Sequence, residues 1–131
     1  MNKRFSVLLI AMLLVLVGTY SFAQSNDPRI NALQGEWVCI RLQQGNEVID
    51  LTASPFKETV ENIWKFEGNN FFSVSRSLLD GASQVDTATF TVVGESLVMS
   101  SEDGTDAYSY TLRGNTLTAT GDGYIFTLRK R

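Results

Sequence analysis

The sequence predicts an all-β protein: an eight- to nine-stranded antiparallel up-and-down β-barrel, with one short helical segment near 54–61. Three observations predict this fold. Apolar and polar residues alternate in short runs from residue 61 onward. Glycine-containing turn signals separate these runs. Eight or nine strands in so small a domain would leave bare edges and a bare apolar face unless the sheet closes on itself.

The turns come from a pattern that three segments share: WKFEGNNFFSV, FTVVGESLVMS and YTLRGNTLTAT. Each has an alternating run, then Gly-Asn or Gly-Glu, then a second alternating run. Glycine adopts positive φ without steric cost, and tight hairpin turns need such residues. Hairpin tips are therefore predicted at Gly45-Asn46, Gly68, Asp80-Gly81, Gly94, Gly114 and Gly121-Asp122-Gly123. The predicted strands lie near 35–42, 61–67, 71–78, 84–93, 96–100, 106–113, 116–120 and 124–130, and 47–51 is a candidate further short strand.

One segment, TASPFKETVEN at 52–62, does not alternate. Ser54 could cap a helix that has Pro55 in its first position, where the missing N–H costs nothing. One or two helical turns are expected here. We expect no second helix after the N-terminal segment.

The N-terminal segment, residues 1–23, has the pattern of a secretory signal peptide. Lys3 and Arg4 precede an apolar run from Phe5 to Val17, and Ser21-Phe22-Ala23 resembles a cleavage site. The rival interpretation is a membrane anchor, but the run is shorter than the roughly 20 residues that span a bilayer. A lipid anchor would need a cysteine where Gln24 stands. We expect cleavage after Ala23, a lead-in over 24–32, one barrel domain over 33–131, and a secreted or periplasmic location with no membrane span.

Composition argues against several functions. Without Lys3 and Arg4 the chain keeps nine Lys and Arg against fourteen Asp and Glu, so nucleic acid is a poor partner. The single cysteine, Cys39, excludes an internal disulfide and fits a small buried apolar residue. The chain has no histidine, so histidine-based catalysis and metal ligation are impossible, and we expect no enzyme, cofactor or metal. A calcium loop at EDGTD ranks low, because Glu102, Asp103 and Asp106 are too few ligands.

Alternation assigns one face of each strand to the barrel interior. The candidate ligand contacts on inner faces are aromatic: Trp64, Phe66, Phe72, Phe90, Tyr108, Tyr110 and Phe126. The same rings could equally fill the barrel as ordinary core.

Two arginines complicate this assignment. Strict alternation places Arg76 on the same face as Phe72, and Arg41 on the same face as Trp37. An inward arginine would be part of a buried network or a partner for an anionic ligand group, because the guanidinium matches a carboxylate. The alternatives are that Arg76 lies at the rim, or that a β-bulge shifts the register.

Gly35-Glu36-Trp37 at the start of the first strand, followed by the meander, resembles the lipocalin and fatty-acid-binding-protein superfamily (calycins), and more closely its small secreted bacterial lipocalin-like domains. The resemblance implies that Trp37 plugs the closed end and that a basic residue of the last strand packs across its ring. Arg129 matches that basic residue best, although alternation points it outward, so Lys130 or Arg131 could replace it. The chain is shorter than full lipocalins and has no disulfide or lid helix pair.

Two functions remain open. The first is a secreted protein that binds a small hydrophobic or anionic amphipathic molecule inside the barrel. The second is a protein-binding or inhibitor module whose barrel is filled with side chains and whose rim loops, near 43–47, 79–84 and 101–106, contact a protein partner.

Overall fold

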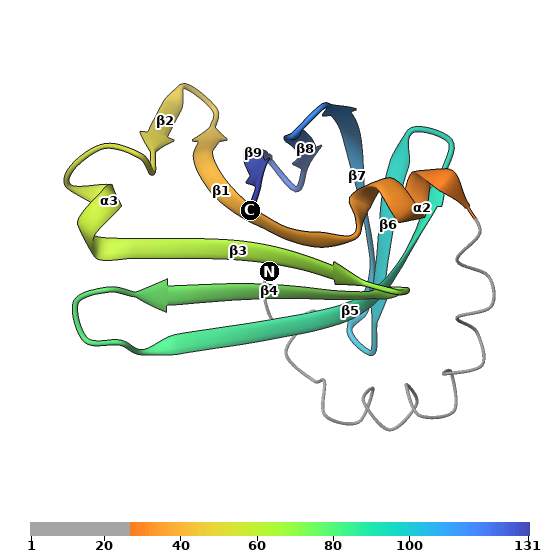
Figure 1. The fold of residues 1–131 in the computed structure, drawn as a ribbon, viewed down its shortest axis with the longest axis horizontal. Coiled ribbons are helices and arrows are strands. Elements are labelled where there is room, and N and C mark those ends of the chain that lie inside the picture. Colours follow the sequence, from red (N-terminus) through yellow and green to blue (C-terminus); the bar gives the residue numbers. More distant parts are fainter. Residues whose placement is uncertain (1–26) are drawn as a thin grey trace.

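The computed structural model describes residues 27–131, so the predicted signal peptide and its cleavage site lie outside the described part of the chain. The ribbon is an antiparallel barrel with a short helix at each end (Figure 1). The strands are β1 (Gly35–Gln44), β2 (Glu47–Asp50), β3 (Val60–Glu67), β4 (Asn70–Ser77), β5 (Ser83–Val93), β6 (Ser96–Ser101), β7 (Gly104–Arg113), β8 (Thr116–Gly121) and β9 (Tyr124–Lys130). The helices are α2 (Pro28–Leu33) and α3 (Phe56–Thr59). The all-β up-and-down prediction is confirmed.

The barrel closes because β1 pairs with β9 along most of its length, from Trp37 opposite Lys130 to Gln44 opposite Tyr124. On its other side β1 pairs with β3 only at its start, over Gly35–Val38. From Arg41 onward β2 takes the place of β3. The closed sheet therefore has eight strands, and β2 is the extra short strand that the sequence suggested.

A β-bulge in β1 settles where Arg41 points. Cys39 pairs with Leu128 but Arg41 pairs with the next residue of β9, Thr127, so one extra residue sits in β1. The bulge resets the alternation, so that Cys39 and Leu42 both face the interior while Arg41 is exposed. The interpretation of Arg41 as an inward group is wrong, and the bulge alternative is correct.

Strand β4 also has a different inner face from the one expected. Phe71 pairs with Phe66 and is buried, whereas Phe72 lies on the outer face with Lys65 Nζ 5.9 Å from its ring centroid. Arg76 is on that outer face too, and its Nη1 is 3.7 Å from Glu61 Oε1. Adjacent phenylalanines made the parity of this strand ambiguous, and pairing with β3 decides it. Phe72 and Arg76 are corrections to the inward assignment.

Helix α2 covers one end of the barrel and was not anticipated. Asp27 caps it by accepting a hydrogen bond from Arg29 N at 2.8 Å, and Pro28 occupies the first turn. Ile30 and Leu33 are buried against the barrel core. Residues 28–33, most of which belong to the predicted lead-in, thus form a helix that covers this end of the barrel, and the expectation of no second helix is wrong. Six residues are too few to display helical periodicity in the sequence.

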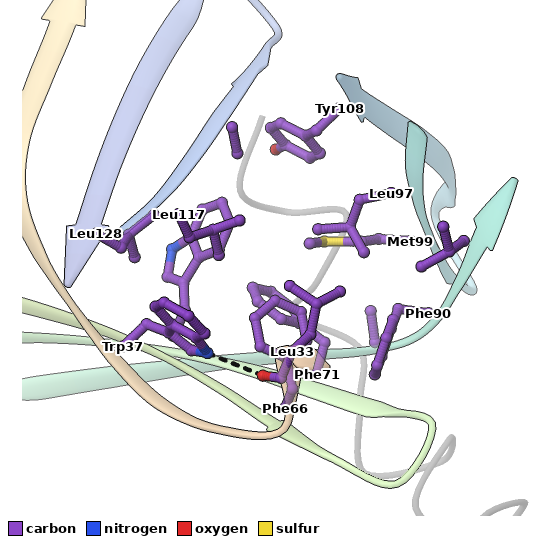
Figure 2. Close-up of a cluster of buried hydrophobic side chains, with 14 of the residues drawn as sticks. Leu33, Trp37, Phe66, Phe71, Phe90, Leu97, Met99, Tyr108, Leu117 and Leu128 are labelled. Carbon is purple, nitrogen blue, oxygen red and sulfur yellow. Dashed lines mark hydrogen bonds between the residues drawn. The ribbon is translucent and has the colours of Figure 1, made fainter. Parts of the chain in front are cut away.

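The Trp37 end is tightly packed (Figure 2). Trp37 is 1% exposed, and its Nε1 donates a hydrogen bond of 2.8 Å to Leu33 O in α2. Lys130 Nζ lies 4.8 Å from the centre of the indole and donates to Gln34 O. The basic residue across the tryptophan is therefore Lys130, and Arg129 is exposed, as alternation along β9 requires.

The backbone of Gly35 explains the glycine of the Gly-x-Trp motif. Its φ is +111°, a conformation that side chains rarely allow, and a Cβ here would be 3.2 Å from Lys130 Cε and Nζ. The glycine thus provides both the backbone conformation and the space through which Lys130 reaches Trp37.

The other helix, α3, lies at the opposite end (Figure 1). Its N-cap is Pro55 rather than Ser54, and no side chain caps it. Ser54 Oγ instead donates to Glu58 Oε2, one turn later. The helical segment near 54–61 is confirmed, but the capping role of Ser54 is wrong.

Candidate ligand-binding cavity

The barrel encloses a cavity of about 410 Å³ that reaches the surface where β2 and α3 lie. Half-exposed Phe56 of α3 is part of its lining. The complete lining is Cys39, Leu42, Ile49, Leu51, Phe56, Val60, Asn62, Trp64, Phe71, Ser73, Ser75, Asp86, Met99, Tyr108, Tyr124 and Phe126. The barrel is therefore not filled to its axis by its own side chains.

One side of the cavity is aromatic and centred on Trp64. The Trp64 ring centroid lies 5.2 Å from that of Phe71, 6.0 Å from Tyr108 and 5.0 Å from Phe126. The Phe71 and Tyr108 contacts are edge-to-face, the arrangement that the aromatic quadrupole favours. These mutual contacts hold the rings as a rigid apolar surface beside the empty volume.

The other side is polar and spans three neighbouring strands. Asn62 on β3 pairs with Ser75 on β4, and Ser73 on β4 pairs with Asp86 on β5. Asn62 Nδ2 donates to Ser75 Oγ at 3.0 Å and is 3.5 Å from Ser73 Oγ. We call these four residues the polar strip. The strip gives a largely apolar cavity a fixed set of hydrogen-bonding groups.

Asp86 is the charged member of the polar strip. It is only 9% exposed, and burial raises the pKa of its carboxyl group, while the hydrogen bond from Gln84 opposes that shift. That bond is long, 3.4 Å from Gln84 Nε2 to Asp86 Oδ1. A carboxylate so placed is under-solvated and weakly partnered.

Cys39 also lines the cavity, but as an inert group. Burial raises the pKa of its thiol to about 11, although its contact with the Arg41 carbonyl opposes the shift. The nucleophilic form of cysteine is the thiolate, so a thiol with this pKa is unreactive near neutral pH. The expected buried apolar role of Cys39 fits its position.

The structure separates the sequence-predicted contacts into three groups. Trp64, Tyr108 and Phe126 line the cavity. Phe66 and Phe90 are buried in the core cluster outside that lining, and Tyr110 is half-buried against the same cluster. Phe72, Arg41 and Arg76 lie outside the barrel and cannot touch a molecule held in it.

Sequence reasoning missed the polar strip and Phe71. A signal for Asp86 was present, because it precedes Ala88, Phe90 and Val92 at the same two-residue period. An acidic residue that shares the two-residue period of inward-facing apolar residues is expected to place a polar group inside the barrel. No comparable signal existed for Leu42, whose inward position depends on the bulge.

Residues 27–131 contain no cluster of three or more His, Cys, Asp or Glu side chains arranged for a metal ion. Glu102 and Asp103 form the tight β6–β7 turn. In this described part of the chain, no helix is long and apolar enough to cross a membrane.

A family model described as a lipocalin-like domain matches residues 33–119, most of the described chain. The chain belongs to the lipocalin-like domain family. This lipocalin-like protein also resembles a solved structure, an uncharacterized protein from Bacteroides eggerthii DSM 20697, with a TM-score of 0.58. The two chains are 11% identical over 76% of this chain and 99% of the other, a likeness of fold alone. No curated protein matches the sequence.

Proposed function

We propose that this lipocalin-like protein is a secreted or periplasmic, non-catalytic binding protein that holds one small amphipathic molecule inside its barrel. The observation that carries the proposal is the cavity of about 410 Å³, bounded by an aromatic surface on one side and the polar strip on the other. Ligand sites typically occupy about 300–1,000 Å³ and combine apolar walls with a few polar groups. The volume suits a compact ligand better than a long acyl chain.

The secreted location rests on the pattern of residues 1–23, with cleavage after Ala23. The absence of histidine removes histidine-based catalysis, and the high pKa of Cys39 leaves this residue without a thiolate near neutral pH, which supports binding rather than catalysis.

The second candidate is a protein-binding module that acts through its rim. It is favoured by apolar side chains at the β4–β5 turn, where Leu78 is 43% and Leu79 is 77% exposed. Its premise was a barrel filled with side chains, and the cavity removes that premise. We therefore rank it second.

Two measurements test the proposal. Native mass spectrometry of protein purified from its own host should reveal a retained small-molecule mass. In addition, a neutral fluorescent probe, N-phenyl-1-naphthylamine, should bind the purified protein. If no mass is retained and the probe does not bind, the small-molecule function is refuted.

A matched pair of variants locates the binding. Ser73→Phe should fill the cavity and abolish probe binding, because Ser73 lines it. Val74→Phe adds the same ring on the outer face of the same strand and should leave binding unchanged. Arg76→Met should also have no effect, because Arg76 is outside. Equal loss in Ser73→Phe and Val74→Phe, with both variants folded, would place the probe elsewhere.

A further inference from the structure

We propose that the ligand carries a protonated amine or similar organic cation, held by the Asp86 carboxylate, with its apolar body against the aromatic surface. This inference rests on the proposed function and specifies its ligand class. It replaces the anionic ligand that the sequence suggested through Arg41 and Arg76.

The charges facing the cavity have one sign. Its sixteen lining residues include the carboxyl group of Asp86 and no lysine or arginine. The arginines of β1 and β4 point away, and Arg76 is next to Glu61 on the outer face. An anionic ligand would therefore enter a site that holds a negative charge and offers no positive one.

The buried carboxylate of Asp86 lacks a positively charged partner within residues 27–131. Ionised carboxylates are rarely this buried without a positive partner, because desolvation costs more than neutral hydrogen bonds return. Among the described residues, Asp86 takes part in no ion pair, and its single side-chain hydrogen bond is the long one from Gln84. A ligand ammonium group would supply the missing charge and short, charge-assisted hydrogen bonds.

The surrounding residues fit an ammonium group. Trp64, Ser73 and Asp86 pair across three adjacent strands, so they form one inward row with Ser73 in the middle. Neighbouring strands are about 4.8 Å apart, which places an aromatic ring, a hydroxyl acceptor and a carboxylate around one small volume. An ammonium ion in that volume can donate to the carboxylate and the hydroxyl and can also contact the electron-rich face of an aromatic ring.

The test compares three ligands with one body and different charges: 2-(1-naphthyl)ethylamine, 2-(1-naphthyl)ethanol and 1-naphthylacetic acid. Each is titrated against protein loaded with N-phenyl-1-naphthylamine at pH 7. The amine should displace the probe at a concentration at least about tenfold lower than the alcohol, and the acid should be the weakest.

Asp86→Asn keeps the shape of the side chain and removes the charge. In this variant the amine should lose its advantage of about tenfold, while the alcohol should bind as before. Glu95→Gln is the matched control, because it removes one negative charge from the exposed β5–β6 turn, outside the cavity lining. This control should keep the amine preference.

The outcomes separate the two proposals. If the probe binds but the acid competes as well as the amine, or if the amine keeps its preference in Asp86→Asn, the cation assignment is wrong and the binding function stands. If the probe and all three ligands fail to bind, and the protein from its host is empty, the binding function itself fails. Loss of the amine preference in both Asp86→Asn and Glu95→Gln would attribute the effect to net charge instead of the site.

Discussion

The two ends of the barrel are built on opposite physical rules. At the α2 end, Trp37 and Leu33 are almost completely buried, and the indole N–H and the Lys130 ammonium both have hydrogen-bond acceptors. At the α3 end, the barrel keeps a cavity and buries a weakly partnered carboxylate, that of Asp86. Buried polar groups are normally paired and interiors are normally close-packed. The closed end is close-packed, although Asn69 Oδ1 of its β3–β4 turn is buried without a hydrogen bond to any described residue. The open end instead keeps free volume beside a carboxylate whose one side-chain hydrogen bond is long.

This difference indicates where stability and binding reside. Close packing and the hydrogen bonds of Trp37 and Lys130 stabilise the fold at the closed end, so substitutions there should reduce the free energy of unfolding. The open end contains an empty cavity and the weakly partnered carboxylate of Asp86. Both destabilise the folded state, and a bound ligand can offset that destabilisation. Substitutions there should change binding, and some should increase stability.

The largest expected effect is at the closed end. Trp37→Ala removes the buried plug and should lower the free energy of unfolding by about 3–5 kcal/mol, as measured by urea denaturation. Tyr124→Ala, at the half-buried cavity wall, should cost much less. Equal losses for the two variants would contradict the contrast between the ends.

The next effect lies at the open end, where Gly121 pairs with the cavity-lining Tyr124. A Cβ on Gly121 would lie 2.6 Å from Tyr108 Cδ2 and 3.0 Å from the Ala107 carbonyl oxygen. Gly121→Ala should therefore displace a ring of the cavity wall, cost about 1–3 kcal/mol and weaken probe binding. Thermal unfolding and probe titration measure the two effects, and a variant with unchanged stability would show that this packing is looser than described.

A smaller effect concerns the cation beside the plug. Lys130→Met keeps an apolar stem near Trp37 but removes the charge and the hydrogen bond to Gln34 O, so it should cost about 1 kcal/mol. Arg129→Met changes the exposed neighbour and should lower the free energy of unfolding by about a few tenths of a kcal/mol at most. Urea denaturation distinguishes them, and a larger loss in Arg129→Met would restore the role that the sequence assigned to it.

The smallest effect has the opposite sign. Burial raises the pKa of Asp86 above its ordinary 3.8. At pH values between the ordinary and the raised pKa, the folded state therefore binds more protons than the unfolded state. Stability is therefore lost as the pH rises through the folded pKa. Asp86→Asn should raise the Tm at pH 7, and this gain should shrink as the pH falls from the raised pKa of Asp86 toward the ordinary Asp value, below which it should vanish. A destabilised Asp86→Asn at pH 7 would mean that the carboxylate has a partner in the folded protein.

Much of the fold was predictable because its signals are local. The glycines at 45, 68, 81, 94, 114 and 123 have positive φ, and alternation between them located the strands to within a few residues. Gly35-Glu36-Trp37 indicated the plugged end. Three of the proposed aromatic contacts, Trp64, Tyr108 and Phe126, line the cavity because alternation on their strands is uninterrupted.

The remaining site residues were not predictable, because their orientation depends on pairing between strands. Phe71 and Phe72 are chemically alike, and only the pairing of β4 with β3 turns the first one inward. The bulge after Cys39 turns Arg41 outward and Leu42 inward without any residue that marks it. Helix α2 forms because Ile30 and Leu33 pack against the apolar end of the barrel. The sequence of its six residues alone does not predict this contact.

The sequence by itself determined a closed antiparallel barrel with a tryptophan at its start, because turn chemistry and two-residue periodicity act over a few neighbouring residues. Only the tertiary structure decided that the barrel contains space, that its arginines lie outside and that one carboxylate faces that space. The free volume and the direction in which each side chain points depend on how strands distant in the chain pair and pack. A bulge of one residue turns the side chains that follow it from the inner face of a strand to the outer face, or the reverse.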